Sequence, residues 1–296
     1  MSEAPFFSVV IPAYNRASFI VKTLHTVLQQ TYQNFEVIVV DDGSTDDTET
    51  QVKSVHDGRL LYFKKPNEER GAARNYGVKR SRARYITFLD SDDLLKSNCL
   101  AEAAQFIDKN PSMDFFHLGY DVIRSDGKII YPWKPLPDPA NRKLVEGNFL
   151  SCLGVFIKRE VLMKYPFRED RELSGSEDYE LWVRLAARYT IRTCPVSVAS
   201  LVNHDERSVL TVDAISLLKR IDLAKKYFLE DEKVREYFGR KLNTLFGYLD
   251  LYAALHLTMG AHRRSAWRLL YSAFKLYPPM FFNYRFWVVI KKLTVG

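Results

Sequence analysis

The stretch Tyr85-Ile-Thr-Phe-Leu-Asp-Ser-Asp-Asp93 decides how the chain folds. Its first five residues are apolar, β-branched or aromatic, which predicts a buried strand, and three carboxylates follow within four residues. Polar residues at the end of a strand in an open α/β sheet reach the crevice where ligands bind. We therefore expect a binding site at the end of this strand. A solvated acidic turn is the alternative, because Asp and Ser favour turns.

The spacing of the carboxylates indicates what the site binds. Asp90 and Asp92 stand two positions apart and share one face of the chain if the strand continues. Carboxylate oxygens suit Mg²⁺ or Mn²⁺, which bind a few protein ligands together with substrate phosphates. Two aspartates at this spacing are common in unrelated proteins, so the assignment depends on the rest of the chain.

The first 110 residues alternate between apolar runs and helical patterns. Four short apolar runs predict strands, and this alternation predicts a mostly parallel α/β sheet flanked by helices. We expect Pro12 to end the first strand because it lacks an N–H group, and Ser18 to cap the helix that follows. The predicted strands are residues 7–11, 35–40, 60–63 and 85–89.

The pattern changes after residue 110. Residues 113–131 predict a β-hairpin, and residues 177–185 predict a helix capped by Ser176. A further strand, starting at about residue 196, ends at His204, and the sequence after it is helical. The chain is therefore predicted to combine a Rossmann-like domain with a C-terminal helical extension.

The helical extension differs from the rest of the chain in charge. We predict a catalytic domain over residues 1–207 and the extension over residues 208–296. The net charge of +7 comes from residues 261–296, which contain nine aromatic residues and no Asp or Glu. This composition favours an anionic membrane surface, and the alternative is that the aromatic residues pack on the catalytic domain. A nucleic-acid partner is disfavoured because no binding motif accompanies the charge. The seven basic residues are Arg263, Arg264, Arg268, Lys275, Arg285, Lys291 and Lys292.

Missing motifs exclude several classes of protein. No G-x-G-x-x-G follows the first strand and no G-x-x-x-x-G-K-[ST] occurs, so neither a dinucleotide site nor a P-loop is supported. The three cysteines are far apart and odd in number, which fits neither a disulfide framework nor a zinc site. No apolar run approaches the ~20 residues of a transmembrane helix. We expect a cytoplasmic protein, at the inner face of the plasma membrane if the basic segment binds lipid.

Five motifs together resemble glycosyltransferase family 2, whose members have the GT-A fold and transfer sugars from nucleotide-sugar donors. Singly each motif is weak, but the five occur in the family's order and spacing. The resemblance covers residues 6 to about 205 and leaves out the helical extension. The motifs are Ser8-Val-Val-Ile-Pro-Ala-Tyr-Asn15, Val39-Val-Asp-Asp-Gly-Ser-Thr-Asp46, Gly71-Ala-Ala-Arg-Asn75, Leu89-Asp-Ser-Asp-Asp93 and Ser176-Glu-Asp-Tyr-Glu-Leu-Trp182.

The resemblance implies a nucleoside pocket at the ends of the first two strands. Asp42 would accept a hydrogen bond from uracil, with Pro12, Tyr14 and Asn15 lining the pocket. The alternative for Asp42 is a turn-forming acid, and the alternative for Tyr14 is packing in the core. No role is assigned to Asp41.

The resemblance assigns the donor's phosphates and the metal to the later motifs. Arg74, close to a helix N-terminus, would bind the diphosphate or else face solvent. Asp90 and Ser91 would contact the donor, Asp90 through the ribose hydroxyls or through a metal-bound water. Asp92 would ligate Mn²⁺ or Mg²⁺, and His204 would join it or serve only as a structural hydrogen-bonding residue.

In this family the catalytic base lies on an acidic helix, which corresponds here to the helix predicted over residues 177–185. The resemblance implies that Asp178 takes the proton of the acceptor hydroxyl and that Glu177 positions the acceptor or the preceding loop. A helix N-terminus favours a negative charge at this place. Helix capping is the alternative for both residues, because acids are ordinary in a first turn.

The sequence thus predicts a metal-dependent inverting glycosyltransferase. Its expected donor is a UDP-sugar, and its acceptor is a hydroxyl of a glycan or lipid-linked intermediate in cell-surface polysaccharide synthesis. One alternative is a catalytically silent sugar-nucleotide-binding or membrane scaffold protein. Another is a sugar nucleotidyltransferase of the same fold, which would need a glycine- and basic-rich loop after the first strand; Pro12-Ala-Tyr-Asn15 is not such a loop.

Overall fold

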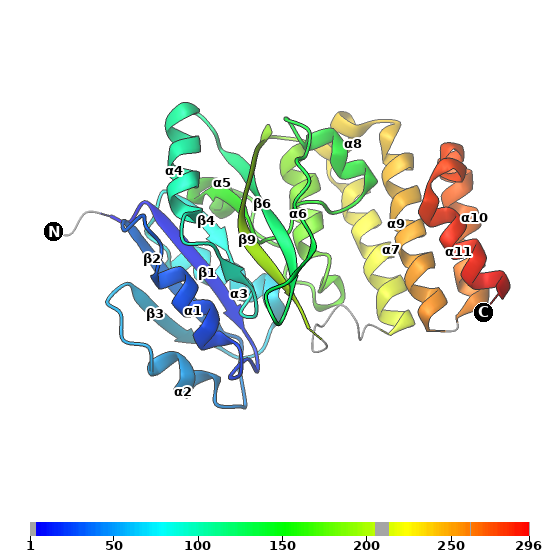
Figure 1. The fold of residues 1–296 in the computed structure, drawn as a ribbon. Helices are drawn as coiled ribbons and strands as arrows, with labels where there is room; N and C mark the ends of the chain where they lie inside the picture. Colours follow the sequence, from blue (N-terminus) through cyan, green and yellow to red (C-terminus); the bar gives the residue numbers. More distant parts are fainter. Residues whose placement is uncertain (1–3, 205–212, 261, 296) are drawn as a thin grey trace. The chain divides into compact units, whose positions relative to one another are not determined.

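The computed structural model describes residues 4–204, 213–260 and 262–295. The chain divides into two compact units, an α/β unit and a helical unit (Figure 1). The helical unit includes two segments from within the predicted catalytic domain, one of which carries Asp178. The α/β unit comprises residues 1–140, 150–171 and 189–206, and the helical unit comprises residues 141–149, 172–188 and 207–296.

A nine-stranded sheet forms the α/β unit. The first four strands of the chain are parallel, as the alternation of strands and helices predicts, and they lie in the order β3-β2-β1-β4. Strands β1, β2 and β4 are rich in Val, Ile and Phe because both faces of the sheet are covered there, whereas β3 is only partly buried. The predicted α/β class is therefore confirmed. These strands are β1 (Phe7–Ala13), β2 (Phe35–Asp41), β3 (Leu60–Lys64) and β4 (Tyr85–Phe88).

The other half of the sheet is mixed. Strand β8 is antiparallel to both β4 and β6, whereas β9 is parallel to β6. The predicted hairpin is present between β6 and β7, and its turn uses Gly127 at a φ of +86°. Strand β9 begins earlier than the sequence predicts, at Ile191. These strands are β5 (Leu94–Leu95), β6 (Phe115–Arg124), β7 (Ile129–Tyr131), β8 (Val155–Lys158) and β9 (Ile191–Asn203).

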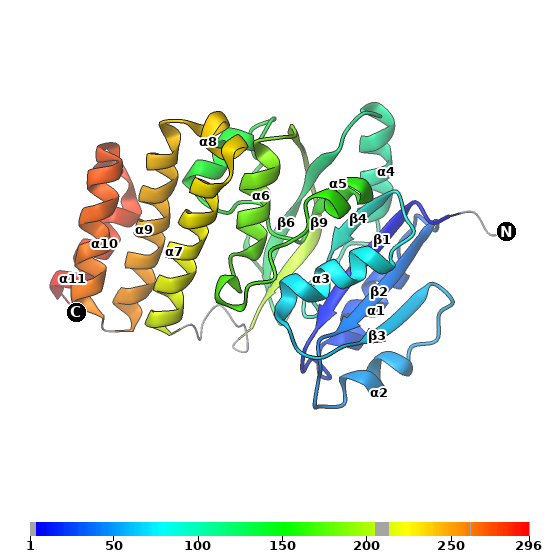
Figure 2. The same cartoon turned by 180° about the vertical axis from the view of Figure 1, so that it is seen from behind.

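Helices cover both faces of the sheet (Figures 1 and 2). Residues of α1 and α4, such as Leu24 and Leu100, belong to one buried cluster with Val9 and Ile11 of β1. On the opposite face, α3 approaches β1 so closely that a Cβ atom at Gly77 would lie 2.4 Å from Cγ1 of Val10. The helices of this unit are α1 (Ile20–Leu28), α2 (Thr48–Lys53), α3 (Glu69–Arg80), α4 (Cys99–Lys109) and α5 (Arg159–Lys164).

Two local predictions at the first strand are wrong. Strand β1 continues through Pro12 because β4 stops pairing with β1 at Val10, so the missing N–H of Pro12 removes no bond on that side. Ser18 does not cap α1, which begins after Phe19 without a side-chain cap. The N–H groups of Phe19 and Ile20 donate instead to the carbonyl of Arg16.

The second unit is helical. Asp250 of α9 is fully buried and accepts hydrogen bonds from Lys225 of α7 and from the hydroxyl of Ser272 of α10 (2.7 Å). This network ties three helices together. The elements are η1 (Asn141–Glu146), α6 (Glu177–Ala186), α7 (Ala214–Glu230), α8 (Glu232–Phe238), α9 (Lys241–Met259), α10 (Arg263–Leu276), η4 (Pro278–Phe282) and α11 (Tyr284–Val295), with η2 (Arg171–Leu173) at the boundary between the units.

The helices differ from membrane spans in length and polarity. Over the described ranges 4–204, 213–260 and 262–295, no helix combines the length and apolar character needed to cross a bilayer.

Gly77→Ala is expected to lower the free energy of unfolding by about 1–3 kcal/mol, because the new methyl group overlaps the fixed side chain of Val10. Urea denaturation monitored by circular dichroism measures the change. Gly58→Ala is the control, since nothing lies within 4 Å of its added Cβ. An equal loss of stability in both variants would contradict the close packing of α3 on β1.

Candidate functional site

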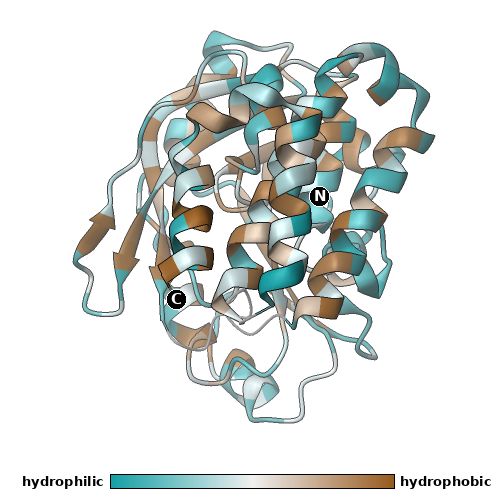
Figure 3. Cartoon of the chain, turned by 90° about the vertical axis from the view of Figure 1, so that its right-hand side faces the viewer, coloured by the Kyte–Doolittle hydropathy of each residue, from teal (hydrophilic) through white to brown (hydrophobic). Residues whose placement is uncertain are grey.

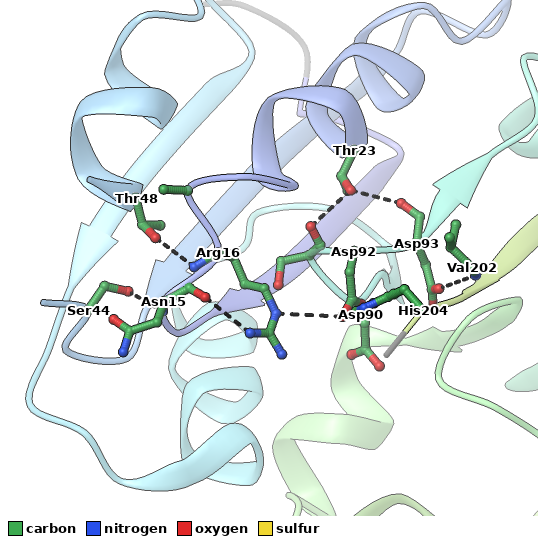
Figure 4. Close-up of polar contacts among 12 residues, drawn as sticks. Asn15, Arg16, Thr23, Ser44, Thr48, Asp90, Asp92, Asp93, Val202 and His204 are labelled. Carbon is green, nitrogen blue, oxygen red and sulfur yellow. Dashed lines mark hydrogen bonds and ion pairs between the residues drawn. The ribbon is translucent and has the colours of Figure 1, made fainter. Parts of the chain in front are cut away.

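The loops after β1 and β2 are joined by Asn15. Its N–H group donates to the hydroxyl of Ser44 (2.9 Å), and its side-chain oxygen accepts from the N–H of Thr45 (2.9 Å). Asn15 has a φ of +52°, a left-handed conformation that Asn tolerates better than most residues. Asn15 therefore holds together the two loops that carry the predicted nucleoside residues (Figure 4).

Asp42 is almost completely buried beside a lysine. Its carboxylate accepts from Nζ of Lys65 (2.7 Å) and from the N–H of Glu68 (3.1 Å). Burial by itself lowers the pKa of Lys65, but hydrogen bonds to Asp42 and Glu68 outweigh burial and raise that pKa above its usual value. Lys65 therefore carries a positive charge beside Asp42 at neutral pH. A carboxylate offers about four acceptor directions, so Asp42 can accept a further donor.

The other predicted nucleoside residues differ in exposure. Tyr14 is 47% exposed, which excludes the core-packing alternative and leaves its ring accessible to a ligand. Pro12 is buried inside β1. Asp41, to which no role was assigned, is fully buried and accepts from the N–H of Ser44 (2.7 Å) and the hydroxyl of Tyr62 (2.6 Å). Asp41 thus stabilises its own loop.

Arg74 is paired with Asp90 of the acidic loop, residues 90–93, which follows β4. It is 2% exposed, its guanidinium donates to Asp90 (2.8 Å), and it lies over the ring of Phe167 at 5.5 Å. Asn75 fixes Phe167 through two hydrogen bonds with its backbone (2.8 and 2.9 Å). Arg74 is therefore not the solvent-facing residue of the alternative. Its contact with Asp90 gives it a positioning role, whereas a contact with a diphosphate stays a prediction.

Asp92 and His204 lie in contact. Nε2 of His204 is 3.2 Å from Oδ2 of Asp92, although the two residues are 112 positions apart. Nε of Arg16 lies 3.5 Å from the same oxygen, and the ring of His204 stacks on Phe19 at 4.7 Å. Figure 4 shows these side chains converging from the loop after β1, the loop after β4 and the end of β9.

Two buried side chains hold this cluster in place. The carboxylate of Asp93 accepts from the N–H of Val202 near the end of β9 (2.8 Å). The hydroxyl of Thr23 lies within hydrogen-bond distance of the carbonyls of Ser91 (3.0 Å) and Asp93 (2.9 Å). The acidic loop is therefore fastened both to α1 and to β9. Ser91 itself is buried, and its predicted contact with the donor stays a prediction.

Asp92 and His204 fit part of a metal site. One carboxylate oxygen and one imidazole nitrogen at this separation suit Mn²⁺, and Mg²⁺ less well. Within the described part of the chain, no group of three or more His, Cys, Asp or Glu side chains could hold a metal ion. An ion at Asp92 and His204 therefore depends on ligand or water oxygens for the rest of its coordination, as ions bound together with substrate phosphates do.

The predicted base belongs to the helical unit. The side-chain amide of Asn148 donates to Asp178 (3.0 Å) at the start of α6. The carboxylate of Glu177 accepts from the N–H of Gly175 (2.6 Å), which has a φ of +86°. Glu177 thus stabilises the turn before the helix. The predicted cap is wrong, because the side chain of Ser176 makes no capping hydrogen bond.

No motif points to three polar residues of these sites. Arg16 directly follows Asn15, so its place in the loop after the first strand is a usable signal. The sequence gives no such signal for Asn148 or Arg220, because each reaches the site only by contacting a residue that is far away in the sequence. Arg220 is 5% exposed and donates to the carbonyl of Ser174 (3.0 Å), close to the turn that Glu177 stabilises.

Comparison with known proteins gives matches of several kinds. The model of glycosyl transferase family 2 matches residues 8–165. A UDP-Glc:alpha-D-GlcNAc-diphosphoundecaprenol beta-1,3-glucosyltransferase of Escherichia coli, WfgD, is 32% identical over 182 residues, covering 60% of this chain and 68% of that protein. An uncharacterised glycosyltransferase of Rickettsia bellii is 44% identical over 184 residues. The match spans 61% of this chain but only 26% of the Rickettsia protein's length.

Solved structures share the fold at low sequence identity. TarS residues 1–349 of S. aureus, in complex with UDP-GlcNAc, has a TM-score of 0.66 and 16% identity, covering 95% of this chain and 91% of that one. A mannosyltransferase of Pyrobaculum calidifontis in complex with GDP-Man and Mn²⁺ has a TM-score of 0.63 and 19% identity, covering 100% and 89%. These likenesses confirm the predicted GT-A fold.

Asp93→Ala is expected to weaken Mn²⁺ binding about 10–100-fold, because loss of the bond to Val202 frees the end of β9 that carries His204. Isothermal titration with Mn²⁺ and a nucleoside diphosphate measures the affinity. Asp93→Asn keeps an acceptor oxygen and should remain close to the wild type. If the two variants bind Mn²⁺ equally well, the Asp93 bond does not position His204.

Proposed function

The chain belongs to glycosyl transferase family 2, and from this premise we propose that it is a metal-dependent inverting glycosyltransferase with a UDP-sugar donor. The contact between Asp92 and His204 (3.2 Å) carries the proposal. It joins a carboxylate and an imidazole from distant positions, in the same unit as the loops of Asn15 and Asp42. We also keep residues 1–207 as the proposed catalytic domain and residues 208–296 as its extension.

A relative supports the choice of UDP as the donor's nucleotide. The name of WfgD, 32% identical to this chain, specifies UDP-Glc, whereas the mannosyltransferase with GDP-Man is only 19% identical. Asp42 is the proposed acceptor for the N3–H of uracil, and the exposed ring of Tyr14 is proposed to lie against the base. Asn15 holds their loops together (2.9 Å).

We assign Asp92 and His204 as the protein's ligands for Mn²⁺ or Mg²⁺. The ion, when bound, would stabilise the negative charge that develops on the departing diphosphate. Arg16 places a permanent positive charge 3.5 Å from Asp92, where it limits repulsion between that carboxylate and a phosphate. Arg74 orients Asp90 (2.8 Å), our proposed contact for the ribose hydroxyls.

We assign Asp178 as the general base. Its carboxylate takes the proton of the acceptor hydroxyl while the hydroxyl oxygen attacks the anomeric carbon of the donor. The bond from that carbon to the nucleotide diphosphate breaks, its electron pair leaves with the diphosphate, and the configuration inverts. Asn148 orients the carboxylate (3.0 Å), and Glu177 stabilises the turn that precedes it.

The proposed acceptor is a hydroxyl of a glycan or of a lipid-linked intermediate in cell-surface polysaccharide synthesis. The name of WfgD supports this class, because it specifies GlcNAc-diphosphoundecaprenol as the acceptor. We place the reaction in the cytoplasm, at the inner face of the membrane when the acceptor is lipid-linked.

Asp178→Asn is expected to bind a UDP-sugar as the wild type does and to transfer it at least about 100-fold more slowly, because a general base contributes about 10²–10⁴ in rate. Release of UDP from a panel of UDP-sugars with Mn²⁺ and an acceptor glycan measures turnover, and thermal shift measures donor binding. Asp108→Asn, which removes an exposed acid from α4, is the matched control. Undiminished transfer by Asp178→Asn would refute its role.

Asp92→Ala is expected to lose both donor binding and turnover, because it removes the proposed carboxylate ligand of the metal. The same assays report the loss, and a chelator should reproduce it in the wild type until Mn²⁺ is restored. Binding of UDP-sugars without transfer by the wild type would instead support the silent binding protein. Release of pyrophosphate from a nucleoside triphosphate and a sugar phosphate would support the nucleotidyltransferase.

A further inference from the structure

The end of the helical unit exposes a concentration of large apolar side chains. Of the 17 large hydrophobic residues exposed in the described part of the chain, nine lie on α10, η4 and α11. The side of the molecule that carries these helices faces the viewer in Figure 3. The nine are Trp267, Tyr271, Phe274, Phe281, Phe282, Tyr284, Trp287, Val288 and Val295.

An aromatic stripe and a basic stripe run side by side along the outer face of α10. Residues three, four or seven positions apart lie on one side of a helix, and both sets follow this spacing. Every side chain of the two stripes is exposed. The aromatic stripe is Trp267, Tyr271 and Phe274, and the basic stripe is Arg264, Arg268 and Lys275.

The hydrophobic core beneath α10 and α11 is formed by residues other than the exposed aromatic ones. Helix α10 already buries Ala266, Leu270 and Ala273 on its inner side, and α11 buries Phe286 and Val289. The packing requirement of both helices is therefore met by other residues. This observation opposes the alternative, left open by the sequence, that the aromatic residues pack against the rest of the chain.

The turn between the two helices presents its most exposed residue in an ordered arrangement. Nε1 of Trp287 donates to the carbonyl of Phe281 (2.8 Å), and the two rings lie 4.8 Å apart. Phe282, next in the chain, is 87% exposed. A phenylalanine held outward by a fixed turn offers apolar surface to a partner without further ordering.

Within the described part of the chain, the positive charge on these helices has no internal counter-ion. Residues 261–296 contain no Asp or Glu, and none of their described basic residues forms an ion pair. Lysines elsewhere in the same unit do form pairs, for example Lys226 with Glu230 (3.8 Å) and Lys233 with Glu236 (2.8 Å). The unpaired cations of α10 and α11 therefore remain available to an external anion.

We propose that the exposed side of α10, η4 and α11, the C-terminal basic face, docks on a membrane surface that contains anionic lipid. Each Lys or Arg close to such a surface strengthens binding about five-fold. Trp and Tyr favour the headgroup boundary, and Phe282 supplies a group that enters the acyl region. A second copy of the face would meet it with like charge, which opposes self-association.

Vesicle flotation of the full chain tests the proposal. The protein should float with phosphatidylcholine vesicles that contain phosphatidylglycerol and should not float with phosphatidylcholine alone. The binding should fall at high salt, because the screening length shrinks from about 10 Å at 0.1 M to about 3 Å at 1 M ionic strength. Equal flotation with both kinds of vesicle, or with neither, would overturn the proposal.

Matched variants locate the binding face. The double variant Arg264→Gln/Arg268→Gln should weaken binding roughly 30-fold, and Phe282→Ser should weaken it as well. Lys226→Gln/Lys233→Gln removes the same charge from the same unit, but from lysines that are paired with glutamates, and should bind as the wild type does. An equal loss in this control pair would show that net charge alone, and not the C-terminal basic face, binds the vesicles.

Two further measurements separate this proposal from others. UDP release in the absence of vesicles reports the proposed transferase activity, so an active protein that fails to float contradicts membrane docking alone. Sedimentation equilibrium of the wild type and of Phe282→Ser tests the competing occupant. A wild-type dimer that this substitution converts to a monomer would show that the face covers a second copy of the chain, and would overturn the proposal.

Discussion

The placement of Asp92 beside His204 depends above all on a buried hydrogen bond from the N–H of Val202 to the carboxylate of Asp93 (2.8 Å). It joins the loop after β4 to the end of β9, two segments that are 109 positions apart. Asp92 precedes one end of this bond and His204 follows the other, so the bond helps to hold the two side chains 3.2 Å apart. Losing this hydrogen bond to a buried carboxylate lowers the stability of the fold by about 1–3 kcal/mol. This penalty opposes separation of the two segments.

Each carboxylate of the proposed donor site has a cation beside it. Arg74 pairs with Asp90 (2.8 Å) and Lys65 with Asp42 (2.7 Å), while Arg16 lies 3.5 Å from Asp92. The arginine and lysine partners limit the repulsion that a diphosphate would meet. Asp90 and both members of the Arg16–Asp92 pair are partly exposed, so water and salt weaken both attractions, and the longer distance makes the Arg16–Asp92 attraction the weaker one.

The charged residues of the helical unit fall into two groups, one paired within the unit and one exposed. Around the predicted base the charged groups are internally bound: Glu180 pairs with Arg184 (2.9 Å), and Arg188 pairs with Asp231 (2.9 Å). On α10 and α11, by contrast, cations stand exposed beside aromatic rings, with no acid in the same segment. The first arrangement stabilises a fold, whereas the second leaves charge and apolar surface for a partner.

The sequence by itself determined the α/β class, the parallel direction of the first strands and the resemblance to the family, because strand periodicity and the spacing of motifs are local signals. Only the tertiary structure decided that Pro12 continues β1, that Arg74 is buried on Asp90, that Arg16 joins Asp92 and that the rings of α10 point outward. Each of these depends on which neighbour lies within a few ångströms across the fold. A side chain's charge and shape do not specify its partner, since dozens of residues of chain separate most of the groups that meet.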